Sequence, residues 1–313
     1  MAVAGFARMA PSAATAQVRH RAAWDAPPRS PAQERFFREL MSTQQLPSAP
    51  EIAQRMLVAV NRDDSSVQDL AKLIARDQSL TARLLRLANS SFFAIRGGVR
   101  SIPQAVTLLG FARVRDIVLG LSVWSTLKGN DARGKQYRRA MWIHTATVAA
   151  AAKILAERTG GDGATAFAAG LMHDVGKLVL GMRLGKTYWA LLDEAKEKGE
   201  AAAAVEEEAF GVHHGTVGGW MLQLWQLPAS LIDPVALHHD PLEPEFGMDL
   251  VASVAVANRL VEATDAETGT ARDEVLEEIR GFAPGLLDGD AWREMYASLA
   301  REQQAVATIF DVA

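Results

Sequence analysis

Apolar residues recur at helical spacing along most of the chain. In the segment 80–88, for example, the leucines at positions 80, 84 and 87 share one face of a helix. Residues that cap helices precede several such segments: Ser79 precedes 80–88, and Ser101 precedes Ile102. The alternation of apolar and polar positions that marks strands is scarce. The pattern therefore predicts an all-α fold.

Two stretches interrupt this helical pattern. Residues 1–33 are rich in Ala, Arg, Pro and Ser and have no sustained period, which predicts a flexible tail. Residues 129–134 are polar and contain two glycines, which marks an internal boundary. We therefore expect one domain over 34–313, built from an N-terminal helical lobe of about 34–128 that packs on a C-terminal helical lobe of about 135–313.

The C-terminal lobe is expected to carry the chemistry, because six of the seven histidines lie within residues 144–239. The remaining histidine, His20, belongs to the tail. The helices expected in this lobe carry, in chain order, His144 (about 136–158), His173 and Asp174 (from about 164), His214 (at a helix start), His238 and His239 (at the end of a helix that Pro228 begins) and Asn258 (249–264).

Composition narrows the classes of function. The absence of cysteine excludes disulfides and thiolate metal ligands. The net charge is −4, and the arginine-rich tail leaves the remainder mildly acidic, which argues against general DNA binding. No apolar run approaches the roughly 20 residues of a membrane span, and the first residues lack the apolar core of a signal peptide. We therefore expect a cytoplasmic protein that binds neither DNA nor a membrane.

The adjacent pair His173-Asp174 is the strongest chemical signal. An imidazole nitrogen and a carboxylate oxygen side by side suit a Zn, Fe or Mn ion. The alternative is a relic site, in which the histidines bond to one another, to Asp174 or to water. Lys177 follows three residues later, and it either steadies a bound phosphate or lies in solvent near a helix end.

The order of these residues resembles the HD superfamily of metal-dependent phosphohydrolases, and it is closest to the HD-GYP cyclic-di-GMP phosphodiesterases. In chain order come His144, the His173-Asp174 pair followed by Gly176-Lys177, His214 with Gly218, and His238-His239. The resemblance implies that Lys177 would be the catalytic residue of an active enzyme. It also implies the following metal ligands: His144, His173, Asp174, His214, His238 and His239.

Two departures separate the chain from the phosphodiesterases. The superfamily's last metal ligand is an aspartate, and the matching position here holds Asn258, whose neutral amide is a weaker ligand. The Gly-Tyr-Pro motif expected after His239 is replaced by Asp240-Pro241-Leu242.

The first half of the chain resembles a related family, the HDOD (HD-related output domain) proteins of bacterial signalling. The resemblance rests on Leu46-Pro47 and on the segments 70–77, 84–90 and 102–106, and it extends to about Asn258. It implies a multi-helix HDOD fold, a regulatory role, and frequent loss of the HD ligands. This chain keeps more of those ligands than the family usually does.

Four further residue groups have simpler interpretations. His213 is expected to be a surface neighbour of the site. Glu206, with Glu207 and Glu208, is expected to form a solvated helix face. Residues 89–91 are expected to end a helix by local hydrogen bonds. Trp220 and Trp225 are expected to lie in the core.

The leading hypothesis is a bacterial signalling protein that acts through partner or ligand binding without turnover. It would bind one or two divalent ions (Fe, Mn or Zn), since Asn258 contributes no charge, or none if the site is a relic. The partners would be a signalling protein, a nucleotide or a cyclic dinucleotide. The chain could also form a homo-oligomer. The alternative is an active phosphohydrolase that acts on a cyclic dinucleotide or a nucleotide.

Overall fold

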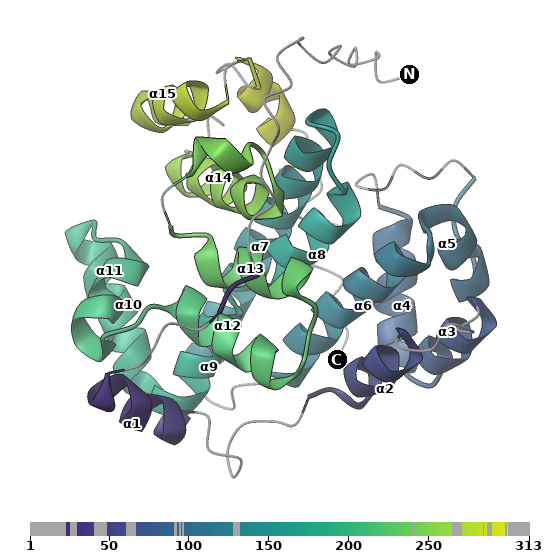
Figure 1. The fold of residues 1–313 in the computed structure, drawn as a ribbon, viewed down its shortest axis with the longest axis horizontal. Helices are drawn as coiled ribbons and strands as arrows, with labels where there is room; N and C mark the ends of the chain where they lie inside the picture. The colour runs from purple at the N-terminus through teal and green to yellow at the C-terminus, as the bar shows by residue number, and fades with distance from the viewer. Residues whose placement is uncertain are drawn as a thin grey trace.

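The structure is a computed structural model that describes most of the chain (Figure 1). The described residues are 23–25, 30–40, 49–60, 67–90, 93, 95, 97–127, 132–240, 242–264, 271–283, 285–286, 290–297 and 299. Within these ranges the fold is all-α, as predicted, and contains no strand. The β-structure recorded there is one isolated antiparallel bridge between Thr264 and Ala271. None of the described helices is long and apolar enough to cross a membrane.

Five helices form the N-terminal lobe, which lies to one side in Figure 1. Ser101 caps one of them as predicted, because its hydroxyl accepts a hydrogen bond from the backbone N–H of Gln104. Ser79 is not a cap: Asp77 accepts from the N–H of Leu80 instead, at 2.9 Å, so the helix starts earlier. The five helices are α2 (Glu51–Val60), α3 (Val67–Ala75), α4 (Gln78–Ala88), α5 (Ile102–Leu109) and α6 (Phe111–Thr126).

Asn89 ends α4, in agreement with its expected role as a local terminator. Its side-chain amide donates to the carbonyl of Leu85 at 2.8 Å and to that of Val99 at 2.7 Å. Its side-chain oxygen accepts from the N–H of Val99 at 2.6 Å. One side chain therefore ties the end of α4 to the segment that leads into α5.

The C-terminal lobe contains the remaining helices except α1. Its first helix begins at Ala132, four residues before the expected start, and residues 129–131 of the expected boundary lie outside the described part. The lobe contains α7 (Ala132–Arg158), α8 (Gly163–Met172), α9 (Val175–Leu184), α10 (Lys186–Lys198), α11 (Ala202–Phe210), α12 (His214–Leu224), α13 (Ala229–Leu237), the short 3-10 helix η1 (Pro244–Phe246), α14 (Leu250–Ala263) and α15 (Asp273–Phe282).

Helix α1 (Pro31–Leu40) lies on the C-terminal lobe, although the sequence analysis assigned residues from 34 onward to the N-terminal lobe. Phe36 stacks on Phe210 with ring centroids 5.5 Å apart, and Phe37 meets Trp220 edge-on at 5.1 Å. The helix begins inside the segment expected to be a flexible tail. Residues 1–22 and 26–29 of that segment lie outside the described residues.

Helix α8 occupies the centre of the molecule, where α6, α7, α13 and α14 pack around it. Small residues permit this packing: a Cβ on Gly170 would lie 2.6 Å from the Cα of Ala149 in α7. On another side, the Trp124 indole of α6 donates to the carbonyl of Leu171 in α8. The C-terminal end of α8, which carries the His-Asp pair, is therefore held deep inside the fold and in direct contact with both lobes.

Candidate metal centre

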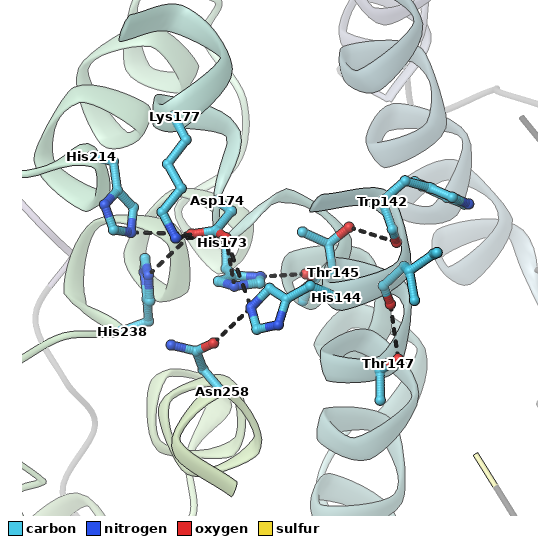
Figure 2. Close-up of polar contacts among 12 residues, drawn as sticks. Trp142, His144, Thr145, Thr147, His173, Asp174, Lys177, His214, His238 and Asn258 are labelled. Carbon is cyan, nitrogen blue, oxygen red and sulfur yellow. Dashed lines mark hydrogen bonds and ion pairs between the residues drawn. The ribbon is translucent and has the colours of Figure 1, made fainter. Parts of the chain in front are cut away.

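The structure brings the predicted ligand residues together from five helices and their ends (Figure 2). His173 ends α8 and Asp174 begins α9, so the pair forms the turn between these helices. Two triads each place their ligand atoms within 4.8 Å of one another. One triad is His144, His173 and Asp174; the other is His214, His238 and His239.

Close packing between α9 and α12 sets the distance between Asp174 and His214. A Cβ on Gly176 would lie 1.8 Å from the carbonyl oxygen of His214 and 2.9 Å from the backbone nitrogen of Gly218. Contacts this short do not occur for real Cβ atoms, so only glycine fits at this position. Because the two helices pack this closely, Oδ1 of Asp174 lies 3.1 Å from Nε2 of His214.

His173 and His238 are oriented in the same way by backbone carbonyls. The Nδ1 of His173 lies 2.8 Å from the Gly170 oxygen, and that of His238 lies 2.8 Å from the Val235 oxygen. A carbonyl only accepts, so Nδ1 carries the proton and Nε2 keeps its lone pair. Both Nε2 atoms are buried without a hydrogen-bond partner among the described residues. They lie 3.6 Å (His173) and 4.0 Å (His238) from the Asp174 carboxylate.

Burial and neighbouring charges together set the protonation states of the side chains in the centre. It lowers the pKa of His173 to about 4 and holds that of His238 well below its ordinary value. Burial alone raises the pKa of Asp174, but the charge of Lys177 and the neighbouring histidines outweigh it and leave that pKa well below its ordinary value. At neutral pH His173 and His238 are therefore neutral imidazoles beside an ionised carboxylate, the forms that bind metal. His214 differs: burial lowers its pKa, but the charge of Glu206 and the contact with Asp174 outweigh burial and raise that pKa above its ordinary value.

Glu206 is a member of this centre that the sequence analysis missed. It was expected in a solvated face with Glu207 and Glu208, and that expectation is wrong for Glu206, which is 0% exposed. Its Oε2 accepts from Nδ1 of His214 at 2.6 Å and from the His214 backbone N–H at 2.7 Å. No sequence signal separates Glu206 from its two exposed neighbours, because the difference arises only from tertiary packing.

His144 and His239 are the more exposed histidines of the centre. The His144 side chain is 24% exposed, and its Nε2 lies 3.8 Å from Asp174 Oδ2. The same Nε2 lies 3.0 Å from Oδ1 of the buried Asn258, so Asn258 reaches the site and contacts a histidine there. The Nε2 atoms of His239 and His214 are 2.8 Å apart.

Lys177 belongs to the interior rather than to solvent. Its Nζ lies 2.9 Å from each oxygen of Asp174, and its side chain is 12% exposed. The nearby His213 caps α12, because its Nδ1 accepts from the Gly215 N–H at 3.2 Å, and it is half-buried rather than a plain surface residue. Trp220 and Trp225 are buried, which confirms the prediction that they lie in the core.

The residues present fit a divalent metal ion. Two buried imidazole nitrogens aim free lone pairs at an ionised carboxylate, and a third imidazole is backed by Glu206. Imidazole nitrogen with carboxylate oxygen is a donor set typical of Zn, Fe or Mn. The residues that would hold the metal are His173, Asp174, His214 and His238, with His144 and His239 as the more exposed members.

Comparison with known proteins agrees with this architecture. A protein of Shewanella amazonensis SB2B, provisionally named a phosphohydrolase, has a crystal structure that matches with a TM-score of 0.68 at 24% identity, over 90% of this chain and 98% of the other. An HDOD domain protein of unknown function from Geobacter sulfurreducens matches with a TM-score of 0.63 at 26% identity, over 88% of this chain and 99% of the other.

The sequence comparisons locate the shared region. An uncharacterized protein of Treponema pallidum (strain Nichols) is 27% identical over 226 residues, which are 71% of this chain. The match covers 43% of that relative, so this chain spans less than half of its length. The family model of the HDOD domain matches residues 46–241. This match covers more than half of the chain, and the chain therefore belongs to the HDOD domain family.

Proposed function

We propose that this chain is a regulatory signalling protein whose His-Asp centre binds one or two divalent metal ions and whose output is a contact with a partner protein. One observation carries the proposal: the Nε2 lone pairs of His173 and His238 are buried, aimed at Asp174 and without a hydrogen-bond partner among the described residues. Burying such groups unpaired costs about 1–3 kcal/mol each, a cost that a metal ion removes.

The charge of the centre supports a small number of ions. Asp174 is the carboxylate shared by the converging side chains, and Lys177 already neutralises it in part. The resemblance matches Asn258 to the superfamily's last aspartate, and its amide, which contacts His144, adds no negative charge. A third dication would therefore lack the charge that holds it.

The same contacts argue against turnover. A bound metal would supply an activated water to a phosphohydrolase. Hydrolysis also needs a cation that holds the phosphate in line, and misplacement by about 1 Å costs roughly 10²-fold in rate. Lys177, the residue that the superfamily resemblance gives this task, is bound to both oxygens of Asp174. Its ammonium is directed into the centre, toward Asp174 (Figure 2).

A physical connection between the centre and the N-terminal lobe supports an output through protein contacts. Helix α8 ends at His173, and α6 of the N-terminal lobe packs along α8. A Cβ on Gly120 of α6 would lie 3.4 Å from the Ala168 carbonyl oxygen, so the two backbones nearly touch. A change at the end of α8 on metal binding would therefore displace α6 and the lobe that it supports.

The test is an assay for hydrolysis by the metal-loaded protein. Cyclic-di-GMP, its linear product and bis-para-nitrophenyl phosphate are incubated with the wild type and with the His173→Ala and Asp174→Ala variants. We expect the wild type to match both variants at the background rate. Turnover in the wild type that disappears in both variants would overturn the proposal and make the protein a metal-dependent phosphohydrolase.

A further inference from the structure

A buried chain of hydrogen bonds runs from the centre to the hairpin formed by α10 and α11. His214 donates from Nδ1 to Oε2 of Glu206 on α11, at 2.6 Å. Tyr188 on α10 donates its hydroxyl to the other oxygen, Oε1, at 2.5 Å. Glu206, Tyr188 and His214 are each 0% exposed, so solvent does not compete for these bonds.

We infer that Glu206 is a positioning residue for the metal centre and that Tyr188 holds its carboxylate in place. Neither residue would touch the metal. The acceptor on Glu206 keeps the proton of His214 on Nδ1, so Nε2 faces Asp174 as a potential ligand. The inference rests on the proposed metal-binding function and extends it to two residues outside the ligand set.

The pattern of acceptors on Glu206 makes the orientation specific. Oε2 accepts from both the imidazole Nδ1 and the backbone N–H of His214, so it fixes the ring and the first residue of α12 together. Oε1 is bound by Tyr188, so the carboxylate cannot turn away. A buried carboxylate is costly unless its oxygens are satisfied, and these three donors satisfy it.

His214 differs in this respect from the other two buried histidines. Backbone carbonyls of the preceding turns orient His173 and His238, and these contacts form wherever the local helix forms. The orientation of His214 depends instead on a side chain from another helix. The hairpin of α10 and α11 therefore contributes to the geometry of the centre although none of its residues would bind metal.

The first measurement locates the imidazole protons by NMR of isotope-labelled, metal-free protein in alkaline buffer. We expect a proton on Nδ1 of His214 in the wild type and in Glu206→Gln, because a glutamine oxygen still accepts. We expect Glu206→Ala to shift that proton to Nε2. A wild-type His214 without a proton on Nδ1 would overturn the inference, and this measurement needs neither metal nor a stable variant.

The second measurement is the affinity for Zn²⁺ by competition with a fluorescent chelator. We expect Glu206→Ala to bind roughly 10–100-fold more weakly than the wild type, with Glu206→Gln between them. Glu207→Ala is the matched control, since it removes the neighbouring exposed carboxylate, and it should bind as the wild type does. Tyr188→Phe removes only the bond to Oε1, so it should weaken binding and keep the proton on Nδ1 of His214.

The outcomes separate this inference from the proposed function. If the wild type binds no Zn²⁺, the proposed function fails, while the NMR result still decides whether Glu206 orients His214. If the wild type binds Zn²⁺ and Glu206→Ala binds it equally well, the proposed function stands and the positioning role is refuted. If Glu206→Ala does not fold, Tyr188→Phe and Glu206→Gln decide, and wild-type affinity in both would refute the role.

Discussion

Replacing Gly176 with alanine should disrupt the centre without replacing any metal-ligating side chain. The new Cβ would lie 1.8 Å from the carbonyl oxygen of His214 and 2.7 Å from its carbonyl carbon. Both atoms belong to the backbone of α12, which cannot rotate away as a side chain can. Real Cβ atoms essentially never approach another heavy atom closer than 3.0 Å, so α9 and α12 must separate by about 1.2 Å to bring the new contact to that distance.

This separation has two consequences of calculable size. Overpacking of this kind costs about 1–3 kcal/mol of folding free energy. Because the new Cβ meets rigid backbone, we expect Gly176→Ala to lose about 3 kcal/mol. The unfolding temperature should then fall by roughly 4–8 °C. The separation also moves His214 relative to Asp174 by more than the roughly 0.2 Å tolerance of metal–ligand distances, so metal retention should be lost.

The assay pairs thermal unfolding with elemental analysis of the variant after metal loading. Gly281→Ala is the matched control, because Gly281 lies in α15 and a Cβ there meets nothing within 4 Å. Alanine is the better helix former, so this control should be neutral or stabilised by up to about 1 kcal/mol. A Gly176→Ala protein that is as stable as the control and retains its metal would refute the reasoning about α9 and α12.

Three further predictions follow from particular side chains. Asp174→Asn should lose metal on dialysis while its circular dichroism stays that of the wild type, because the change is isosteric but removes the charge; undiminished metal content would contradict this. In the metal-free protein, the folded pKa of His173 is about 4 and the unfolded one about 6.5, so unfolded chains bind more protons between these values. The free energy of unfolding should therefore decrease as the pH falls from about 6.5 to about 4, by up to about 1.4 kcal/mol per pH unit for this histidine, and denaturant titrations that show a flat profile would contradict it. Asn89→Ala should lower the free energy of unfolding by about 1–3 kcal/mol, because it leaves the buried N–H of Val99 without its acceptor; an unchanged denaturation midpoint would refute the bridging role.

The all-α fold could be predicted because it depends on local pattern, whereas the convergence of the histidines was expected from the resemblance of their order to the HD superfamily. Helical spacing and caps are read from neighbouring residues, and the structure confirms the predicted cap at Ser101. Where two capping residues compete, the pattern is less decisive. Asp77 and Ser79 lie two residues apart, and the structure shows that Asp77 starts α4.

The contacts that the sequence could not reveal are those made between distant helices. Glu206 and Glu207 are indistinguishable in sequence, and only the packing of α11 against α12 buries one of them. Lys177 also had two open interpretations. Its ion pair with Asp174 is local, at i,i+3, but the burial of both side chains depends on the packing around α9. That the converged residues bind a metal stays a prediction.

Elemental analysis of the purified, metal-loaded wild-type protein shows whether the His-Asp centre holds an ion. We expect one or two equivalents of Zn, Fe or Mn per chain after dialysis, since His173 and His238 present buried lone pairs to the ionised Asp174. A stoichiometry of zero, with every candidate metal offered in turn, would contradict the account and leave the centre a relic whose histidines only pack and bond with one another.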